Sequence, residues 1–211
     1  MIMGEYFDKK AKAWDQQKDR IERAHVIAKL MKDRIPITTA MNALEFGCGT
    51  GLLGFELINN VGNLTFTDTS SGMLEEVKRK VEDLKIRNYR VINLSEEELS
   101  GQFDLIFSLM ALHHIKDYEF EVRKLIQKLT VGGFICLCDL DREDGSFHTE
   151  IKVPHNGFER SQIESIYKTC GLEPVCSVTA YVDRRQIGSE EREYPIFMII
   201  GKRIAYTSVS T

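Results

Sequence analysis

The chain has 211 residues, 43% of them hydrophobic and 28% charged, which is the size of one domain with a single core. Its 28 Lys and Arg against 32 Asp and Glu give a formal net charge of −4, which argues against general electrostatic capture of nucleic acid or of an anionic membrane. No apolar run approaches the roughly 18 residues of a membrane helix, and the charged N-terminus lacks the apolar centre of a secretory signal. We therefore expect a cytoplasmic protein whose five cysteines, an odd number without zinc-like spacing, are unpaired thiols.

Hydrophobic spacing predicts strands and helices that alternate along the chain. Helices are expected over 15–34, 50–59, 71–84, 118–129 and 157–170, and strands over 41–46, 64–67, 89–93, 103–107, 134–140, 173–182 and 194–202. Pro36 ends the first helical pattern, and Gly132-Gly133 follow the fourth. A polar loop, DRRQIGSEER at 183–192, is expected to join the last two strands.

Alternating strands and helices imply an α/β fold, with a mostly parallel, doubly wound sheet and helices on both of its faces. The last two strands have no helix between them, so they are expected to form an antiparallel hairpin at one edge. We expect residues 1–36 to be an N-terminal helical lid or appendage, residues 37–204 the main domain, and residues 205–211 a loose tail. Ligands of such sheets bind at the carboxyl ends of the strands.

The stretch ALEFGCGTGLLG at 43–54 is the most informative part of the sequence. Its last six residues satisfy the G-x-G-x-x-G pattern of nicotinamide-cofactor proteins. However, Glu45 precedes the glycines, and a carboxylate beside such a loop repels a diphosphate and attracts a cationic ligand. S-adenosylmethionine carries an ammonium and a sulfonium, so Glu45 favours that cofactor. Asp68, about 20 residues after the glycines, can accept hydrogen bonds from ribose hydroxyls of either cofactor.

Five stretches together resemble the class I S-adenosylmethionine-dependent methyltransferases. LEFGCGTG is similar to the first motif of that family, FTDTSSGML to the second, and FDLIFSLMALHHI to the fourth-strand motif, with the Leu-His-His-Ile ending common among small-molecule enzymes. LTVGGFICLCDL resembles the segment before the fifth strand, although Val131 replaces the usual proline, and YFDKKAKAWD resembles a stretch ahead of the domain. The resemblance runs from about residue 6 to residue 172 and implies a Rossmann-like seven-stranded sheet.

The resemblance also implies which residues hold S-adenosylmethionine. Glu45 and the glycines would bind its methionine part and Asp68 its ribose, while Tyr6, Phe7 and Trp14 would fold over it as a lid. Asn93 or Ser95 would replace the acid that the family often has after the third strand. The full expected set is Tyr6, Trp14, Glu45, Gly47, Cys48, Gly49, Gly51, Asp68, Thr69, Met73, Asn93, Leu94, Ser95, Ser108 and Leu109.

The family has no universal catalytic residue, because methyl transfer needs a base only when the acceptor atom is protonated. Ser108-Leu109-Met110-Ala111 is not the Asn-Pro-Pro-Tyr type of motif used on exocyclic or amide nitrogens. We therefore expect a small-molecule oxygen or nitrogen acceptor, with a protein substrate as the open alternative. Acids and histidines gather after the expected strand 134–140. From that location His148 or His155 is expected to act as the base, with His113 as a further candidate and with Asp139 and Asp141 shaping the pocket.

Several alternatives stay open from the sequence. The chain could be an NAD(P)-dependent oxidoreductase or a non-catalytic protein that binds S-adenosylmethionine. The histidines could also be parts of a polar turn. No metal site is predicted, because the spacing of Glu143, Asp144 and His148 is not diagnostic. The oligomeric state and the identity of the acceptor are not predicted.

Overall fold

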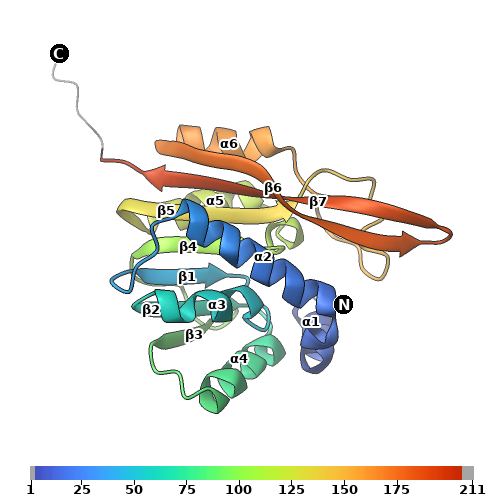
Figure 1. The fold of residues 1–211 in the computed structure, drawn as a ribbon, viewed down its shortest axis with the longest axis horizontal. Helices are drawn as coiled ribbons and strands as arrows, with labels where there is room; N and C mark the ends of the chain where they lie inside the picture. The colour runs from blue at the N-terminus through green and yellow to red at the C-terminus, as the bar shows by residue number, and fades with distance from the viewer. Residues whose placement is uncertain (1–2, 206–211) are drawn as a thin grey trace.

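A computed structural model describes residues 3–205, and within them a seven-stranded sheet runs through the middle of the molecule (Figure 1). The strands are β1 (Asn42–Phe46), β2 (Asn63–Asp68), β3 (Tyr89–Asn93), β4 (Phe103–Leu109), β5 (Leu129–Leu140), β6 (Leu172–Ile187) and β7 (Glu190–Arg203). Their order is β3-β2-β1-β4-β5-β7-β6, with parallel pairing from β3 to β5 and antiparallel pairing of β7 with both neighbours. The predicted doubly wound sheet with an antiparallel edge hairpin is therefore confirmed.

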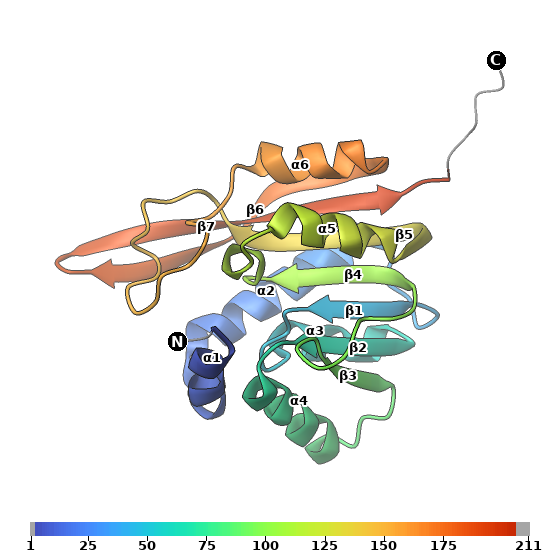
Figure 2. The same cartoon turned by 180° about the vertical axis from the view of Figure 1, so that it is seen from behind.

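Helices cover both faces of the sheet (Figures 1 and 2). They are α1 (Met3–Lys10), α2 (Lys18–Arg34), α3 (Leu52–Leu57), α4 (Ser71–Asp83), α5 (Tyr118–Gln127) and α6 (Arg160–Thr169), with short 3-10 helices at Ala11–Gln16, Ile58–Asn60 and Leu112–His114. Buried residues of α2, α3 and α4 form one hydrophobic core with the sheet, and those of α5 and α6 form a second core on the opposite face. Two apolar layers thus hold the strands that carry the site.

Side-chain caps fix where the helices beside the site begin. The Ser70 hydroxyl accepts a hydrogen bond from the Met73 N–H at the start of α4, and the Asp117 carboxylate accepts one from the Phe120 N–H at the start of α5. These caps satisfy backbone donors that would otherwise lack partners inside the helix. Both lie in loops that follow parallel strands, at the edge of the sheet where ligands bind.

The direction of strand order reverses at β1, because β2 lies on one side of it and β4 on the other. In an open α/β sheet the loops after such a pair of strands diverge and leave a crevice at the carboxyl ends. The glycine loop follows β1, and the Leu112–His114 turn follows β4. The topology therefore brings these two segments to one crevice.

The structure corrects several predicted boundaries. The stretch 183–192 was expected to be a loop, which is wrong for most of it: β6 and β7 extend through it to a turn at Gly188, where φ is +63°. Strand β5 begins at Leu129 rather than 134, so Gly132-Gly133 lie within it. Polar side chains pair across the longer hairpin and stabilise it, as Arg184 does with Glu193. A hydrophobic pattern in the sequence does not predict such pairs.

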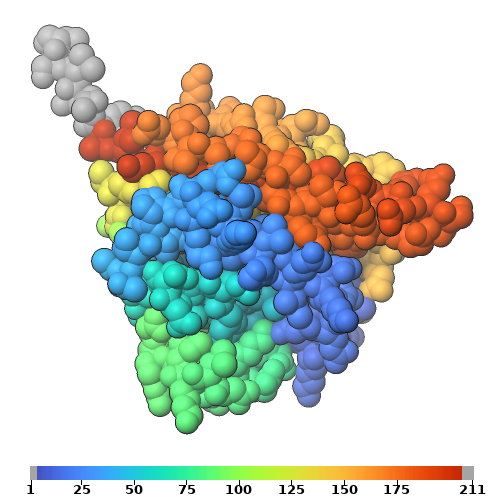
Figure 3. Space-filling view, in the orientation of Figure 1, coloured from blue at the N-terminus to red at the C-terminus, as the bar shows by residue number. Residues whose placement is uncertain are grey.

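At the N-terminus, α1 precedes the helix expected from the sequence, and α2 begins at Lys18 rather than 15. Figure 3 shows the blue N-terminal segment and the orange-red β6–β7 hairpin side by side on one face of the molecule. Within residues 3–205, none of the helices combines the length and the apolar character needed to cross a bilayer. Most of the expected loose tail, residues 206–211, lies outside the described residues.

Candidate functional site

A cavity of about 770 Å³ lies at the carboxyl ends of the strands and is covered by α1 and the start of α2. Its wall at one end includes Glu45, Gly47, Gly49, Asp68 and Met73, a group we call the loop end. At the other end, which we call the histidine end, its wall includes His113, His114, His148, Arg20, Arg23 and Arg185. A cavity of this size falls in the range of sites for small molecules and cofactors.

Glu45 is a buried carboxylate that lacks a full set of partners. It is 2% exposed, and its Oε2 atom has no hydrogen-bond partner among the described residues. Burial raises the pKa of Glu45 well above its usual range, although the Gly54 N–H and Lys80 act in the opposite direction. Because an unpartnered buried carboxylate costs free energy, the side chain is suited to a cationic ligand group.

Asp68 holds the glycine loop in place at the end of β2. Its Oδ2 accepts the Gly49 N–H at 2.8 Å, and its Oδ1 accepts the Ser70 N–H at 2.9 Å. Each carboxylate oxygen has a further lone pair, so Asp68 can also accept hydrogen bonds from ligand hydroxyls. Burial raises the pKa of Asp68, and the backbone donors oppose that shift.

Gly47 allows the segment after β4 to approach the glycine loop. Its φ is +65°, a conformation that glycine adopts at little cost, and a Cβ atom there would lie 2.4 Å from the Ala111 Cβ. A larger residue would push the Leu112–His114 turn away from the loop. The glycine therefore determines how closely the two ends of the cavity approach each other.

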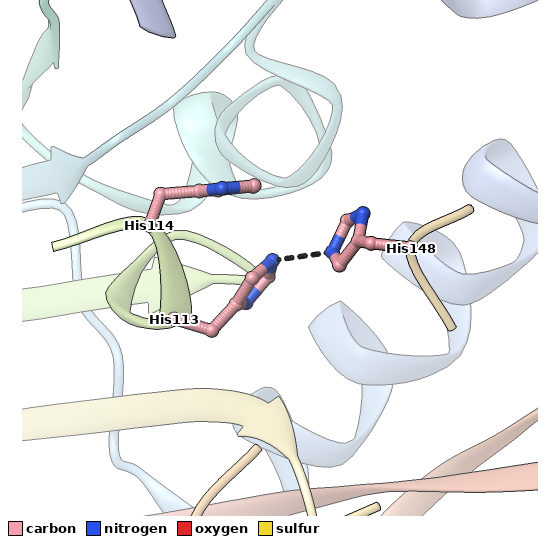
Figure 4. A group of neighbouring side chains, drawn as sticks. All are labelled: His113, His114 and His148. Carbon is pink, nitrogen blue, oxygen red and sulfur yellow. Dashed lines mark hydrogen bonds between the residues drawn. The ribbon is translucent and has the colours of Figure 1, made fainter. Parts of the chain in front are cut away.

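Three side chains at the histidine end form a hydrogen-bonded chain. Asp139 Oδ1 lies 2.6 Å from His113 Nδ1, and His113 Nε2 lies 2.9 Å from His148 Nε2 (Figure 4). Both oxygens of Asp139 also accept backbone N–H groups, those of Leu112 and Leu140 among them. Because Asp139 acts as an acceptor, the His113 Nδ1–H donates to it, and a neutral His113 presents Nε2 as an acceptor. His148 then donates from Nε2, and its Nδ1 keeps the lone pair.

His114 and His148, which line the cavity, are held in the neutral form. Burial, followed by the neighbouring His113 and Arg185, lowers the pKa of His148 to about 3. Burial, followed by His113 and His148, lowers the pKa of His114 to about 2. At neutral pH each of these imidazoles keeps a nitrogen lone pair that can accept a hydrogen bond or bind a metal.

His113, His114 and His148 could offer ligand atoms that all lie within 4.8 Å of one another. Two nitrogens on one tetrahedral zinc ion stand roughly 3.3 Å apart, given bonds of about 2.0–2.1 Å. The 2.9 Å between His113 Nε2 and His148 Nε2 is instead a hydrogen-bond distance. The arrangement therefore fits a proton chain better than a metal centre.

Most of the residues expected from the sequence meet at this cavity. Those on its wall are Tyr6, Phe7, Trp14, Glu45, Gly47, Cys48, Gly49, Asp68, Thr69, Met73, Leu94, Leu109, His113 and His148. Gly51 instead begins α3, and buried Ser108 has an Oγ without a partner for which we have no physical account. The Asn93 side chain bonds Ser71 and Glu96, and the Ser95 hydroxyl bonds the Thr69 carbonyl.

His155 and Asp141 lie away from the cavity wall. His155 Nε2 lies 3.0 Å from the Ile115 carbonyl, and its ring packs edge-on against Tyr118. Asp141 pairs with Arg160 and so links the end of β5 to α6. These contacts are structural ones, in contrast to the cavity-facing position of His148.

Arg20, Arg23 and Arg185 are cavity residues that sequence reasoning missed. Arg20 and Arg23 each stand four residues before a member of the buried stripe of α2, which runs Ala24, Ile27, Ala28 and Met31. An arginine that continues an apolar stripe is a signal that could have been read, because charged residues rarely face a core without a partner. Arg185 gave no such signal, since it stands in a polar stretch.

The N-terminal residues close the cavity from outside. The Tyr6 hydroxyl and the Lys10 ammonium both bond Glu150 at 2.8 Å. Phe7 packs edge-on against Trp14 and His114, with ring centroids 5.6 Å and 5.1 Å apart. The aromatic side chains therefore form a cover whose outer contacts are exposed ion pairs and hydrogen bonds.

Comparisons with known proteins agree with this geometry. Residues 44–135 match a family model described as a methyltransferase domain. An uncharacterized methyltransferase of Schizosaccharomyces pombe, C1347.09, is 28% identical over 153 residues, which are 64% of this chain and 54% of that relative. The chain thus spans about half the length of this curated relative.

Two solved structures share the fold. One holds the Haloferax volcanii Trm112 methyltransferase activator and a methyltransferase, and its match has a TM-score of 0.76 at 15% identity over 94% of this chain and 98% of that one. The other is an S-adenosylmethionine-dependent methyltransferase from Aquifex aeolicus, with a TM-score of 0.65 at 17% identity over 92% of this chain and 97% of that one. At such identities the likeness concerns the fold.

Proposed function

We propose that the chain is a class I S-adenosylmethionine-dependent methyltransferase and that it transfers a methyl group to an oxygen or nitrogen atom of a small molecule; the match of residues 44–135 to a methyltransferase domain supports this. The single observation that carries the proposal is the Glu45 carboxylate: Glu45 is a buried residue of the wall of a cofactor-sized cavity, and its Oε2 has no hydrogen-bond partner among the described residues. A cationic group would stabilise the ionised form of that carboxylate, whereas a diphosphate would be repelled by it. A nicotinamide cofactor therefore fits this loop less well.

The loop end fits S-adenosylmethionine residue by residue. Glu45 would pair with the ammonium group of the cofactor, and Asp68 would accept hydrogen bonds from its ribose. Met73 and Leu94, both on the cavity wall, offer apolar contacts to the adenine. When bound, the cofactor supplies a methyl group on a positively charged sulfur, which an acceptor atom displaces in line.

The histidine end supplies the base that a protonated acceptor needs. His148 lines the cavity, and its Nδ1 carries a lone pair when its Nε2–H donates to His113. When the acceptor atom takes the methyl group, His148 Nδ1 would take the proton that this atom loses. Its own Nε2 proton passes to His113 Nε2. The positive charge then rests on His113, beside the Asp139 carboxylate.

This chain explains how an imidazole with a lowered pKa can serve as a base. His148 alone would hold a proton poorly, because burial disfavours its charged form. Asp139 is fully buried and lies 2.6 Å from His113, so it stabilises a proton on that ring instead. His148 therefore accepts the proton from the acceptor, and His113 carries the resulting positive charge.

The proposal is tested by calorimetry with S-adenosylhomocysteine and with NAD(P), followed by a metabolite screen with a labelled methyl donor. We expect S-adenosylhomocysteine to bind in the micromolar range and the label to appear in a small acceptor. Binding of NAD(P) without S-adenosylhomocysteine would reverse the assignment. Binding of S-adenosylhomocysteine without any labelled product across the screen would favour a non-catalytic role.

A further inference from the structure

Three arginines converge on the histidine end from two elements distant in the sequence. Arg20 and Arg23 come from the first turns of α2, and Arg185 comes from the extended part of β6. The length of the β6–β7 hairpin places Arg185 there, because the hairpin reaches beyond the end of β5 to the start of α2 (Figure 1). The cavity wall thus gathers three guanidinium groups.

One buried carboxylate serves two of these groups. Asp183 accepts the Arg23 Nη1–H at 2.7 Å and lies 3.5 Å from Arg185 Nη2. Both members of the closer pair are buried, with 7% of Arg23 and 4% of Asp183 exposed. Arg23 nevertheless keeps a buried Nε–H that has no hydrogen-bond partner within residues 3–205. A buried donor without an acceptor is costly, so this atom indicates room for a further acceptor.

Arg20 has no carboxylate partner among the ion pairs of residues 3–205. Its Nη1 donates to the Trp14 carbonyl at 3.2 Å, and its guanidinium lies 3.4 Å from the centre of the Trp14 ring. Burial, then the nearby Arg23 and Arg185, lowers the pKa of Arg20 to about 10. The three cations therefore repel one another, and an anion placed among them would relieve that repulsion.

The other acids on this part of the wall do not neutralise the cluster. Glu150 is bound by Lys10 and Tyr6 at the outer cover, and Asp19 is exposed. Asp139, which is not on the wall itself, bonds His113 and backbone N–H groups. Positive charge is thus in excess where Arg20, Arg23 and Arg185 meet.

From these contacts we propose that the methyl acceptor is a small oxyanion, a carboxylate or a phosphate ester, whose charged group binds Arg20, Arg23 and Arg185. The guanidinium fork matches both kinds of oxyanion. Arg185 also donates to the Phe147 carbonyl at 2.8 Å, next to His148, so an acceptor anchored here has its remaining atoms close to the proposed base. The inference rests on the proposed function only in making the bound oxyanion the methyl acceptor. Binding of an oxyanion to this site can be measured without methyl transfer.

The first experiment uses Trp14, the single tryptophan of the sequence, as a probe. Because Arg20 stacks on its ring, an anion bound to Arg20 should change its fluorescence. The protein, with and without saturating S-adenosylhomocysteine, is titrated with cyclohexanecarboxylate and cyclohexyl phosphate, and with the neutral cyclohexanecarboxamide and cyclohexanol. We expect a saturable change with one or both anions and none with the neutral compounds. The two anions separate the carboxylate source from the phosphate source.

Variants then locate the site. In Arg185→Gln, affinity for the preferred anion should fall at least about tenfold, while affinity for S-adenosylhomocysteine stays within about twofold. Arg185→Lys, which keeps the charge but not the fork, should lose less. Arg184→Gln is the matched control, because Arg184 is exposed on the same hairpin and pairs with Glu193. Circular dichroism establishes that each variant is folded.

Three outcomes would overturn the inference: equal binding of neutral and anionic compounds, an unchanged anion affinity in Arg185→Gln, or a parallel loss of S-adenosylhomocysteine affinity. The last would assign the cluster to the carboxylate of the cofactor itself. Selective anion binding without S-adenosylhomocysteine binding would reject the proposed function and keep the oxyanion site. Labelled products that all arise from neutral acceptors would reject the oxyanion acceptor and keep the methyltransferase.

Discussion

The loop end of the cavity is built by one short stretch of chain, whereas the histidine end is assembled from segments far apart in the sequence. Glu45, Gly47, Gly49, Asp68 and Met73 all fall within a span of 29 residues, on two adjacent strands, the turns that follow them and the start of α4. The histidine end takes residues from α2, from the turn after β4, from the loop after β5 and from the distal part of β6.

The two ends also differ in how their charges are satisfied. Among the described residues, Glu45 Oε2 at the loop end and Arg23 Nε at the histidine end are buried atoms without a hydrogen-bond partner. A cation is suited to the first and an anion to the second. The difference suggests that the loop end selects the methyl donor and the histidine end selects and activates the acceptor. Variants should therefore affect one end and spare the other.

The largest effect is expected at the histidine end, in His148→Gln. Loss of the base should lower kcat by about 10²- to 10⁴-fold for the acceptor found in the labelled screen. Affinity for S-adenosylhomocysteine, measured by calorimetry, should change by less than about twofold because the loop end is untouched. His155→Gln provides the comparison: His155 bonds main-chain carbonyls away from the cavity, so kcat should fall by less than about threefold. Equal losses in both variants would contradict the proton chain.

A smaller effect is expected at the loop end, in Glu45→Gln. Removing the charge that meets the ammonium group should weaken S-adenosylhomocysteine binding by about 10- to 100-fold, the range of a hydrogen bond to a charged group. The KM for the acceptor should remain nearly constant. Glu75→Gln on the exposed face of α4 serves as the control and should bind normally.

The same site predicts a pH dependence of cofactor binding. Burial holds the pKa of Glu45 well above its usual range, so the free protein carries more of the protonated form as pH falls. An ammonium ligand requires the ionised form, and binding should therefore release a proton and weaken toward acid pH. Calorimetry in buffers of different ionisation enthalpy measures that proton. Glu45→Gln should abolish the Glu45 contribution to the release.

The smallest effect concerns stability. Burial lowers the folded-state pKa values of His114 and His148 to about 2 and about 3, from the usual 6.5 of a histidine. Below pH 6.5 the unfolded chain binds protons that the folded protein does not, so stability is lost as pH falls from that value toward pH 3. The upper limit is about 1.4 kcal/mol per pH unit for each ring, and partial exposure reduces it.

Urea unfolding at a series of pH values between neutral and pH 5 measures this slope. His114→Phe should make the slope shallower, because it removes one of the two neutral imidazoles. His25→Gln should leave it unchanged, since His25 is exposed on α2 and contacts Glu56. A slope that is the same in all three proteins would show that the buried histidines do not govern acid stability.

The loop end could be predicted from the sequence because its chemistry is local. Glu45 and the three glycines stand next to one another, and Asp68 follows at a characteristic distance. The sheet that carries them could also be predicted, because strand and helix patterns alternate along the chain and imply parallel pairing. The fold and the loop end could therefore be predicted from residues that lie close together in the sequence.

The histidine end was predicted only in part. His148 and His113 were candidates because they follow buried strands, yet nothing local joins them to each other, and their contact depends on the path of the loop after β5. The partnership of Arg23 with Asp183 spans 160 residues and needs a hairpin longer than its apolar core suggests. Polar pairs across such distances leave no periodic pattern, so they become visible only in three dimensions.

Residues 3–17 do more than cover the cavity. Asp8 accepts the Ser70 hydroxyl at 2.6 Å and the Gly72 N–H at 2.8 Å at the start of α4, while Asp15 receives the Thr50 hydroxyl and pairs with Lys80. The apparent appendage therefore braces the same helix that carries Met73. A chain shortened to begin at α2 would keep every motif of the domain. It would nevertheless lose the hydrogen bonds and the ion pair that hold α4 and the loop end of the cavity in place.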